Sequence, residues 1–176
     1  MKSTVKRGWV LAALFLFVLA GCKPVPWTEF KSADGNFSVL LPGTPTADVQ
    51  TINTKSGPIE IHFFTLSTKN AVYSVSYSDY PASLFDTTPI KSILDGARDG
   101  AVKNSQGRLI DEADIALGTY PGRALNVESS GGTNVMKAHL YMVGHRLYQV
   151  IVVTGKRGAS SPDLTKFLDS FQLAAP

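Results

Sequence analysis

Apolar and polar side chains alternate with a period of two along much of the chain, which is the pattern of antiparallel strands that bury one face. Residues 147–154 are instead apolar on both faces, so we expect this strand near the centre of a sheet. Turn signals at Asp34-Gly35 and Tyr120-Pro121-Gly122 precede two of the segments. The pattern predicts strands at residues 37–41, 59–64, 72–80, 108–117, 123–128, 135–143 and 147–154.

Two further segments have the three-to-four residue apolar spacing of amphipathic helices. The first begins at Thr88-Pro89, a capping residue followed by proline, and its apolar stripe covers residues 90–102. Gly96 and Gly100 weaken this helix and lie off the stripe. The second begins near Ser161-Pro162. Core packing explains both stripes more simply than a binding groove does; the second stripe consists of Leu164, Phe167, Leu168 and Phe171.

Strands combined with two helices predict an α+β fold, in which a central antiparallel β-sheet is flanked by helices. The chain has 176 residues, of which 44% are hydrophobic. A chain of this size buries about two-thirds of its unfolded surface, which is enough for one core. We find no internal repeat, and we expect a single domain over residues 29–176.

The first 21 residues have the layout of a secretory signal peptide. Basic residues Lys2, Lys6 and Arg7 precede an unbroken apolar run from Trp9 to Ala20. The uncharged stretch of residues 8–22 is shorter than the roughly 20 residues that a membrane-spanning helix needs. The leader therefore predicts export, with cleavage near residue 21, rather than a permanent transmembrane helix.

The segment Leu19-Ala20-Gly21-Cys22 resembles the bacterial lipoprotein lipobox. The resemblance implies a diacylglycerol on the Cys22 sulfur, cleavage between Gly21 and Cys22, and acylation of the new amino terminus, for example by palmitate. Residues 22–28 would then be the lipidated cysteine and a short tether. An ordinary signal peptide with an incidental cysteine is the alternative, although Cys22 is the one cysteine of the chain.

These features predict an extracytoplasmic protein held on a membrane through the acyl chains of Cys22. Lipoprotein sorting rules associate an aspartate after the cysteine with retention in the inner membrane, and Lys23 stands there instead. The expectation is therefore the outer membrane facing the periplasm, if the host has two membranes.

The positive net charge belongs to the leader alone. Lys2, Lys6 and Arg7 account for the whole excess of 17 basic over 14 acidic residues. The mature domain is therefore neutral, and it lacks the basic face that displaces counterions from nucleic-acid phosphates. Nucleic acid is excluded as a partner.

Motifs for phosphate, nucleotide or nucleophilic chemistry are absent from the sequence. We expect no catalytic residue and no cofactor. His62 and His139 lie on different predicted strands and are weak metal candidates, with ordinary strand histidines as the simpler interpretation. The acidic residues 111–114 match no calcium loop, and they are expected on a solvated edge. Residues 154–158 offer amides and positive charge to an anion, or form a simple polar connection.

Four segments of core and turn residues together carry a family resemblance. They are Trp27–Phe30, Gly35–Gly43, Tyr120–Arg123 with the hairpin that reaches Tyr148, and Phe167–Phe171. They resemble the PsbP-like α/β/α sandwich, as found in photosystem II extrinsic subunits and DcrB-type bacterial lipoproteins, and the likeness spans most of residues 27–173. It implies a central antiparallel sheet flanked by helices and an accessory or binding role.

We therefore expect a lipid-anchored cell-envelope protein that is not an enzyme. Its role would be binding or assembly, with another envelope protein as partner. The first alternative is a carrier of a small apolar ligand or lipid, which an apolar cavity between sheet and helix would favour. The second is a hydrolase, which requires a histidine within hydrogen-bond reach of both a serine and an acid.

Overall fold

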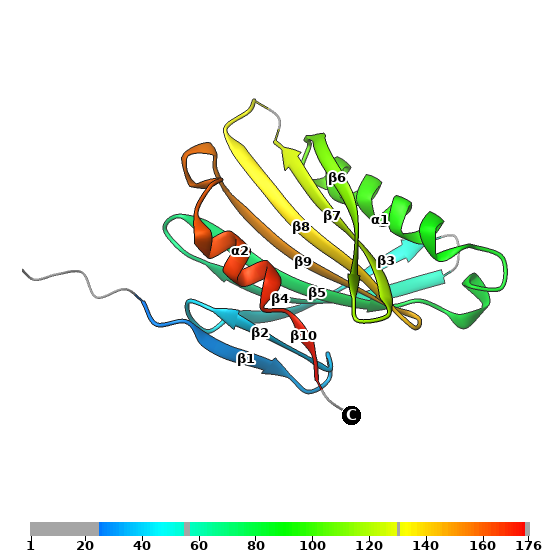
Figure 1. Ribbon diagram of the computed structural model, residues 1–176. Helices are drawn as coiled ribbons and strands as arrows, with labels where there is room; N and C mark the ends of the chain where they lie inside the picture. Colours follow the sequence, from blue (N-terminus) through cyan, green and yellow to red (C-terminus); the bar gives the residue numbers. More distant parts are fainter. Residues whose placement is uncertain (1–24, 55–56, 130, 175–176) are drawn as a thin grey trace, which may run out of the picture.

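The computed structural model describes residues 25–54, 57–129 and 131–174 (Figure 1). Two antiparallel β-sheets and two α-helices make up most of this part of the chain. In chain order the elements are β1 (Thr28–Ser32), β2 (Phe37–Leu41), β3 (Thr46–Thr54), β4 (Gly57–Ser67), β5 (Ala71–Asp79), the 3-10 helix η1 (Ala82–Leu84), α1 (Ile90–Asn104), β6 (Arg108–Leu117), β7 (Tyr120–Glu128), β8 (Asn134–Val143), β9 (Arg146–Gly155), the 3-10 helix η2 (Lys156–Gly158), α2 (Pro162–Asp169) and β10 (Gln172–Leu173).

The larger sheet has seven strands in the order β3-β4-β5-β9-β8-β7-β6, and every neighbouring pair is antiparallel. The strand β9 lies in its middle, as its apolar residues on both faces predict. The smaller sheet has the order β1-β2-β10, so it joins the first described strands to the last.

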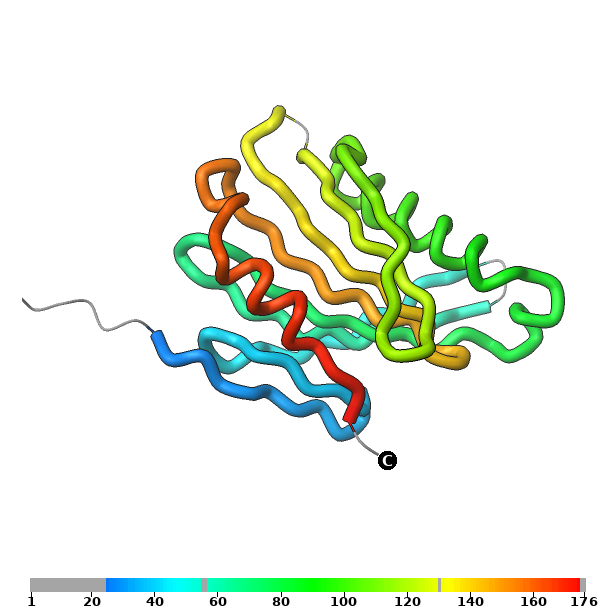
Figure 2. Tube along the Cα trace, in the orientation of Figure 1, coloured from blue at the N-terminus to red at the C-terminus, as the bar shows by residue number. Residues whose placement is uncertain are grey.

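The large sheet is covered differently on its two faces (Figures 1 and 2). Helix α1 lies against one face, where Ile93 and Leu94 pack on β7, β8 and β9. The small sheet and α2 cover the other face. There Phe37 is completely buried among aromatic rings, which are those of Phe30, Phe64, Tyr148 and Phe171.

The expected α+β class, a sheet flanked by helices, is wrong. Of the described residues, 54% lie in strands and 20% in helices, and a second β-sheet takes the place of a helical layer beside α2. The sequence pattern missed β1, β3 and β10 because these strands do not alternate clearly. All but one of the nine residues of β3 are exposed, and β10 has only two residues.

The other predicted elements are confirmed. Each of the seven predicted strands is present, including the polar segment that forms β6. Helix α2 begins where the sequence predicts, with the Ser161 hydroxyl accepting a hydrogen bond from the amide of Asp163 at 3.3 Å. Helix α1 begins one residue later than predicted, with Pro89 in place of Thr88 as its N-cap. No helix in the described segments has the length and apolarity to cross a membrane.

Candidate functional site

The predicted lipidation residue Cys22 and its neighbour Gly21 lie outside the described residues. The weak metal candidates His62 and His139 do not meet. They stand on β4 and β8, and β5 and β9 lie between those strands, which separates the two side chains by about 14 Å at the usual strand spacing. The described residues contain no group of three or more side chains that could hold a metal ion.

Each histidine instead has a local structural contact. The ring of His62 stacks on Tyr77, with 4.5 Å between ring centroids. Nδ1 of His139 lies 3.2 Å from the Tyr141 hydroxyl, and burial lowers the pKa of this imidazole. The ring of His145 lies 4.6 Å from that of Phe85. Within residues 25–54, 57–129 and 131–174, no histidine forms a hydrogen bond with a serine.

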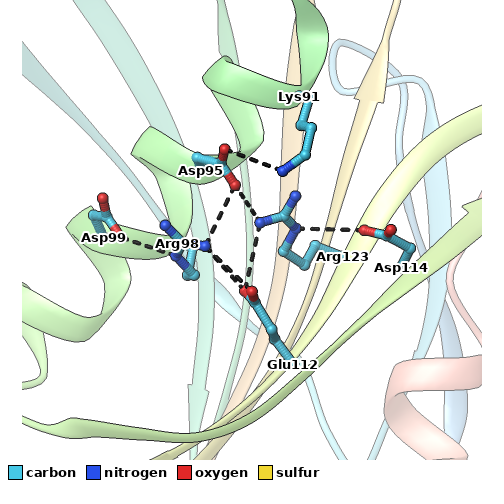
Figure 3. Close-up of polar contacts among 7 residues, drawn as sticks. All are labelled: Lys91, Asp95, Arg98, Asp99, Glu112, Asp114 and Arg123. Atoms are coloured by element: carbon cyan, nitrogen blue, oxygen red, sulfur yellow. Dashed lines mark hydrogen bonds and ion pairs between the residues drawn. The ribbon is translucent and has the colours of Figure 1, made fainter.

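An ion-pair network fixes α1 on the large sheet (Figure 3). Its centre is Arg123 of β7, whose side chain is 4% exposed. The guanidinium Nη1 donates to Asp95 of α1 and lies 3.4 Å from Oε2 of Glu112 on β6. Nε of Arg123 lies 3.7 Å from Oδ1 of Asp114. Two residues of the predicted acidic edge, Glu112 and Asp114, thus contact a buried arginine.

A second arginine extends the network along the helix. Nη1 of Arg98 lies 3.3 Å from Asp95 and 3.2 Å from Glu112, and its Nε donates to Asp99 at 2.8 Å. Lys91 adds a contact to Asp95 at 3.4 Å. The hydrogen bond from Arg123 holds the pKa of the Asp95 carboxyl below its usual value. The network thus contains four acidic and three basic side chains, and its Asp95–Arg123 and Arg98–Glu112 pairs tie α1 to the β6–β7 edge.

This attachment leaves much of the same sheet face uncovered. Helix α1 packs on β7 and β8, whereas β3, β4 and β5 extend beyond it on the same face (Figure 1). The result is a groove of about 660 Å³ between α1 and the sheet, which we call the α1 groove. Its apolar lining comes from β3, β4, β8, β9, η1 and α1 and comprises Ile52, Ile59, Ile61, Phe63, Leu84, Ile93, Ala97, Ala101, Met136, Leu147, Ile151 and Val153.

Polar groups are confined to the floor of the α1 groove and its ends. Every second residue in this part of β5 faces the groove, and each of these residues is a serine. Two of them, Ser76 and Ser78, are both 3% exposed. Ser76 stands directly opposite Gln149 of β9. Neither side chain has a hydrogen-bond partner among the described residues, so a hydroxyl and a carboxamide in the middle of the floor are free to bind a ligand. No described residue that lines the groove is charged.

Small residues on α1 keep the helix wall of the groove shallow. Gly96 and Gly100 both line it, and a Cβ atom at either position would meet no other atom within 4 Å. A glycine inside a helix costs about 1 kcal/mol relative to alanine. The chain thus carries two destabilising residues at the positions where a larger side chain would enter the groove.

Sequence reasoning missed the α1 groove, although two signals for it were visible. The serines that alternate on one side of β5 are too polar for a buried strand face that only packs against a core. The two glycines of α1 lie beside its apolar stripe, where exposed positions would ordinarily carry helix-forming residues. What the sequence did not show is that both features lie on the same groove.

Comparisons with known proteins identify the fold and no closer relative. No family model matches the chain, and no curated protein matches it. Among solved structures, the chain is similar to the cyanobacterial PsbP protein (CyanoP) of Synechocystis sp. PCC 6803. The TM-score is 0.58 at 13% sequence identity, over 90% of this chain and 98% of that one.

Two further structures are less similar. A Pseudomonas aeruginosa protein of unknown function matches with a TM-score of 0.39 at 13% identity, over 74% of this chain and 84% of that one. A Bacteroides thetaiotaomicron protein matches with a TM-score of 0.44 at 14% identity, over 84% of this chain and 48% of that one. The similarity to CyanoP confirms one part of the resemblance seen in the sequence: the chain has a PsbP-like fold.

Proposed function

We propose that this protein is a lipid-anchored, non-enzymatic binding protein of the cell envelope, and that it holds an uncharged apolar ligand in the α1 groove. The observation that carries the proposal is the groove itself, which has apolar walls, an uncharged lining and two unpaired polar side chains in its floor.

The lining indicates the chemistry of the ligand. Ligand sites are typically apolar hollows of about 300–1,000 Å³ with a few polar groups that fix orientation, and the α1 groove falls in this range at about 660 Å³. A charged ligand group would find no counter-charge there, so we infer an uncharged one. Ser76 and Gln149 can bond an ester, amide or hydroxyl, while the isoleucines and Phe63 contact a hydrocarbon chain. A neutral acyl ester or amide satisfies both parts.

Membrane attachment is the second half of the proposal. It is supported by the lipobox-like segment Leu19–Cys22 behind an apolar leader. Two or more acyl chains give stable anchoring, because each buried methylene contributes about 0.8 kcal/mol. A carrier on a membrane surface would have acyl lipids within reach as ligands.

The first experiment tests the ligand. The full chain is purified from host membranes in dodecyl maltoside, and neutral lipids that remain bound are extracted and counted by mass spectrometry. Gly100→Leu places an isobutyl group in the groove and is expected to abolish stoichiometric neutral lipid. Ser92→Leu adds a side chain of the same kind on the exposed side of α1 and is expected to retain it. Equal lipid in both variants would refute the groove as the site.

The second experiment tests the anchor independently. Cells are labelled with radioactive palmitate, which is expected to mark the wild-type protein and not Cys22→Ser. Label in both proteins would refute lipidation at Cys22 and would leave the ligand result unaffected.

A second candidate function is assembly with another envelope protein through β3. This strand forms one edge of the large sheet over nine residues, and β4 is its one partner among the described strands. Val49 and Ile52 on it are 52% and 43% exposed. An exposed edge strand of this length can pair with a strand of a partner. A lysine at an edge blocks such pairing, so a partner recovered with the wild type from solubilised membranes should be lost with Val49→Lys. Retention of the partner would exclude β3 as its binding site.

A further inference from the structure

A second hollow lies on the α2 side of the large sheet, and it is separate from the α1 groove. Its volume is about 910 Å³, and it lies where the start of β5, the end of β9, η2 and the start of α2 come together. We call it the η2 recess. Four residues of the segment 154–158, which the sequence marked as a possible anion site, line it: Thr154, Gly155, Arg157 and Gly158.

The walls of the η2 recess are fixed by partly buried hydrogen bonds. The hydroxyl of Thr154, a residue that is 6% exposed, donates to the carbonyl of Asn70 at 2.8 Å and so holds the β4–β5 turn against the end of β9. The Thr68 hydroxyl donates to the carbonyl of Ala71 at 2.8 Å and closes that turn. The positions of the turn and of η2 are therefore set by the fold.

Positive charge is in excess around this recess. Lys69, Arg157 and Lys166 line it, and Asp163 is the one acidic residue in its lining. Lys69 and Arg157 have no ion-pair partner among the described residues. The adjacent Lys156 differs, because it pairs with Glu128. An anion in the recess would neutralise charge that the protein leaves unpaired.

The floor of the η2 recess is apolar. Trp27, Tyr73 and Leu164 line it, and the Trp27 ring lies edge-on to Tyr73 at 5.8 Å between centroids. Nζ of Lys166 lies 4.7 Å from the centroid of Trp27. A cationic rim over an apolar floor suits an amphiphilic anion better than a small inorganic ion, which would leave the floor uncovered.

The recess is also close to the expected point of membrane attachment. Val25 lines it, and Cys22 is three residues earlier, a separation that an extended chain spans in about 10 Å. Resting on the anchor in the proposed function, we propose that the η2 recess binds the phosphate headgroup of an anionic phospholipid in the membrane that carries the protein. Lys69 and Arg157 contact the phosphate, and Trp27 packs against the glycerol and upper acyl carbons.

The test uses the full chain in dodecyl maltoside, titrated with dihexanoyl phosphatidylglycerol and followed by calorimetry. Saturable binding is expected, with little heat from dihexanoyl phosphatidylcholine or inorganic phosphate. The double variant Lys69→Gln/Arg157→Gln should bind about 30-fold more weakly, the effect of two basic residues at an anionic lipid surface. The matched control Lys31→Gln/Lys103→Gln removes two exposed lysines elsewhere and should bind like the wild type.

Trp27 reports where the lipid binds. The chain has two tryptophans, and the other, Trp9, lies in the leader. Lipid binding is therefore expected to change the fluorescence emission of Trp27, and this change must disappear in Trp27→Phe if the headgroup occupies the recess. Absence of saturable binding, equal weakening in the control variant, or equal binding of inorganic phosphate would each overturn the proposal. The mass of the same preparation shows whether Cys22 is lipidated, so failure of the anchor is distinguishable from failure of the recess.

Discussion

The space beside the two glycines of α1 leads to a prediction about the stability of the protein. Replacing Gly96 and Gly100 by alanine should stabilise the protein, because alanine is favoured over glycine in a helix by about 1 kcal/mol. Such a gain requires that the added methyl group meets no obstacle. A Cβ atom at either position has no other atom within 4 Å, so neither methyl group clashes.

The expected gain is about 2 kcal/mol for the double variant, with about half from each substitution. For a domain of this size, 1 kcal/mol corresponds to about 2–4 °C in Tm, so the double variant should melt about 4–8 °C higher. Urea denaturation followed by circular dichroism measures the free energy directly. The slope of the free energy of unfolding with urea concentration should be unchanged, because the surface exposed on unfolding hardly changes.

A loss of stability in either alanine variant would refute this reasoning. It would mean that another part of the chain fills the groove in solution and is displaced by the methyl group. Ser92→Ala is the matched control, because it lies on the exposed side of the same helix and should change the free energy of unfolding by no more than about 0.5 kcal/mol.

Three further predictions concern the core and the charges. Phe37→Ala should cost about 3–5 kcal/mol in urea denaturation, because the ring is completely buried among other aromatic rings. Arg123→Leu should cost about 2 kcal/mol and should speed amide hydrogen exchange in α1, because it leaves the carboxylates of the network without their central partner; unchanged exchange would contradict this role. Hydrogen bonds from Arg123 and Lys156 lower the pKa of Asp95 and Glu128 on folding. The stabilisation from these pairs is therefore complete above the usual pKa values of 3.8 and 4.5, and it is lost as the pH falls through the lowered values. The urea concentration at the unfolding midpoint should drop below about pH 4, whereas a constant midpoint would show that these pairs add nothing to stability.

The sequence predicted the parts of the fold that have strong local patterns. Strands of the large sheet such as β5 and β9 bury side chains in a regular pattern, and α2 has a capping serine followed by proline. The strand β3 was not predicted, because an edge strand with both faces exposed does not require apolar and polar residues to alternate. Without β1 and β10 the second sheet could not be predicted, and the fold class was wrong for that reason.

The candidate site was less predictable because it depends on how separate elements meet. Arg123 appeared as an ordinary strand residue, and only the packing of α1 against β6 and β7 shows that three carboxylates converge on it. Ser76 and Gln149 are 73 positions apart in the sequence and become neighbours through the β5–β9 pairing. His62 and His139 were metal candidates by residue type alone, and the order of strands in the sheet separates them.

The pairing of β10 with β2 has a consequence for synthesis of the chain. Leu173 pairs with Phe37, and the amide of Ala174 donates to the carbonyl of Asn36 at 2.9 Å, so β2 gains this neighbour only after more than 130 further residues have been synthesised. Until then the aromatic core around Phe37 lacks the ring of Phe171. In a nascent chain this core therefore stays open, and exposed to chaperones and proteases, until residues 167–174 have been synthesised.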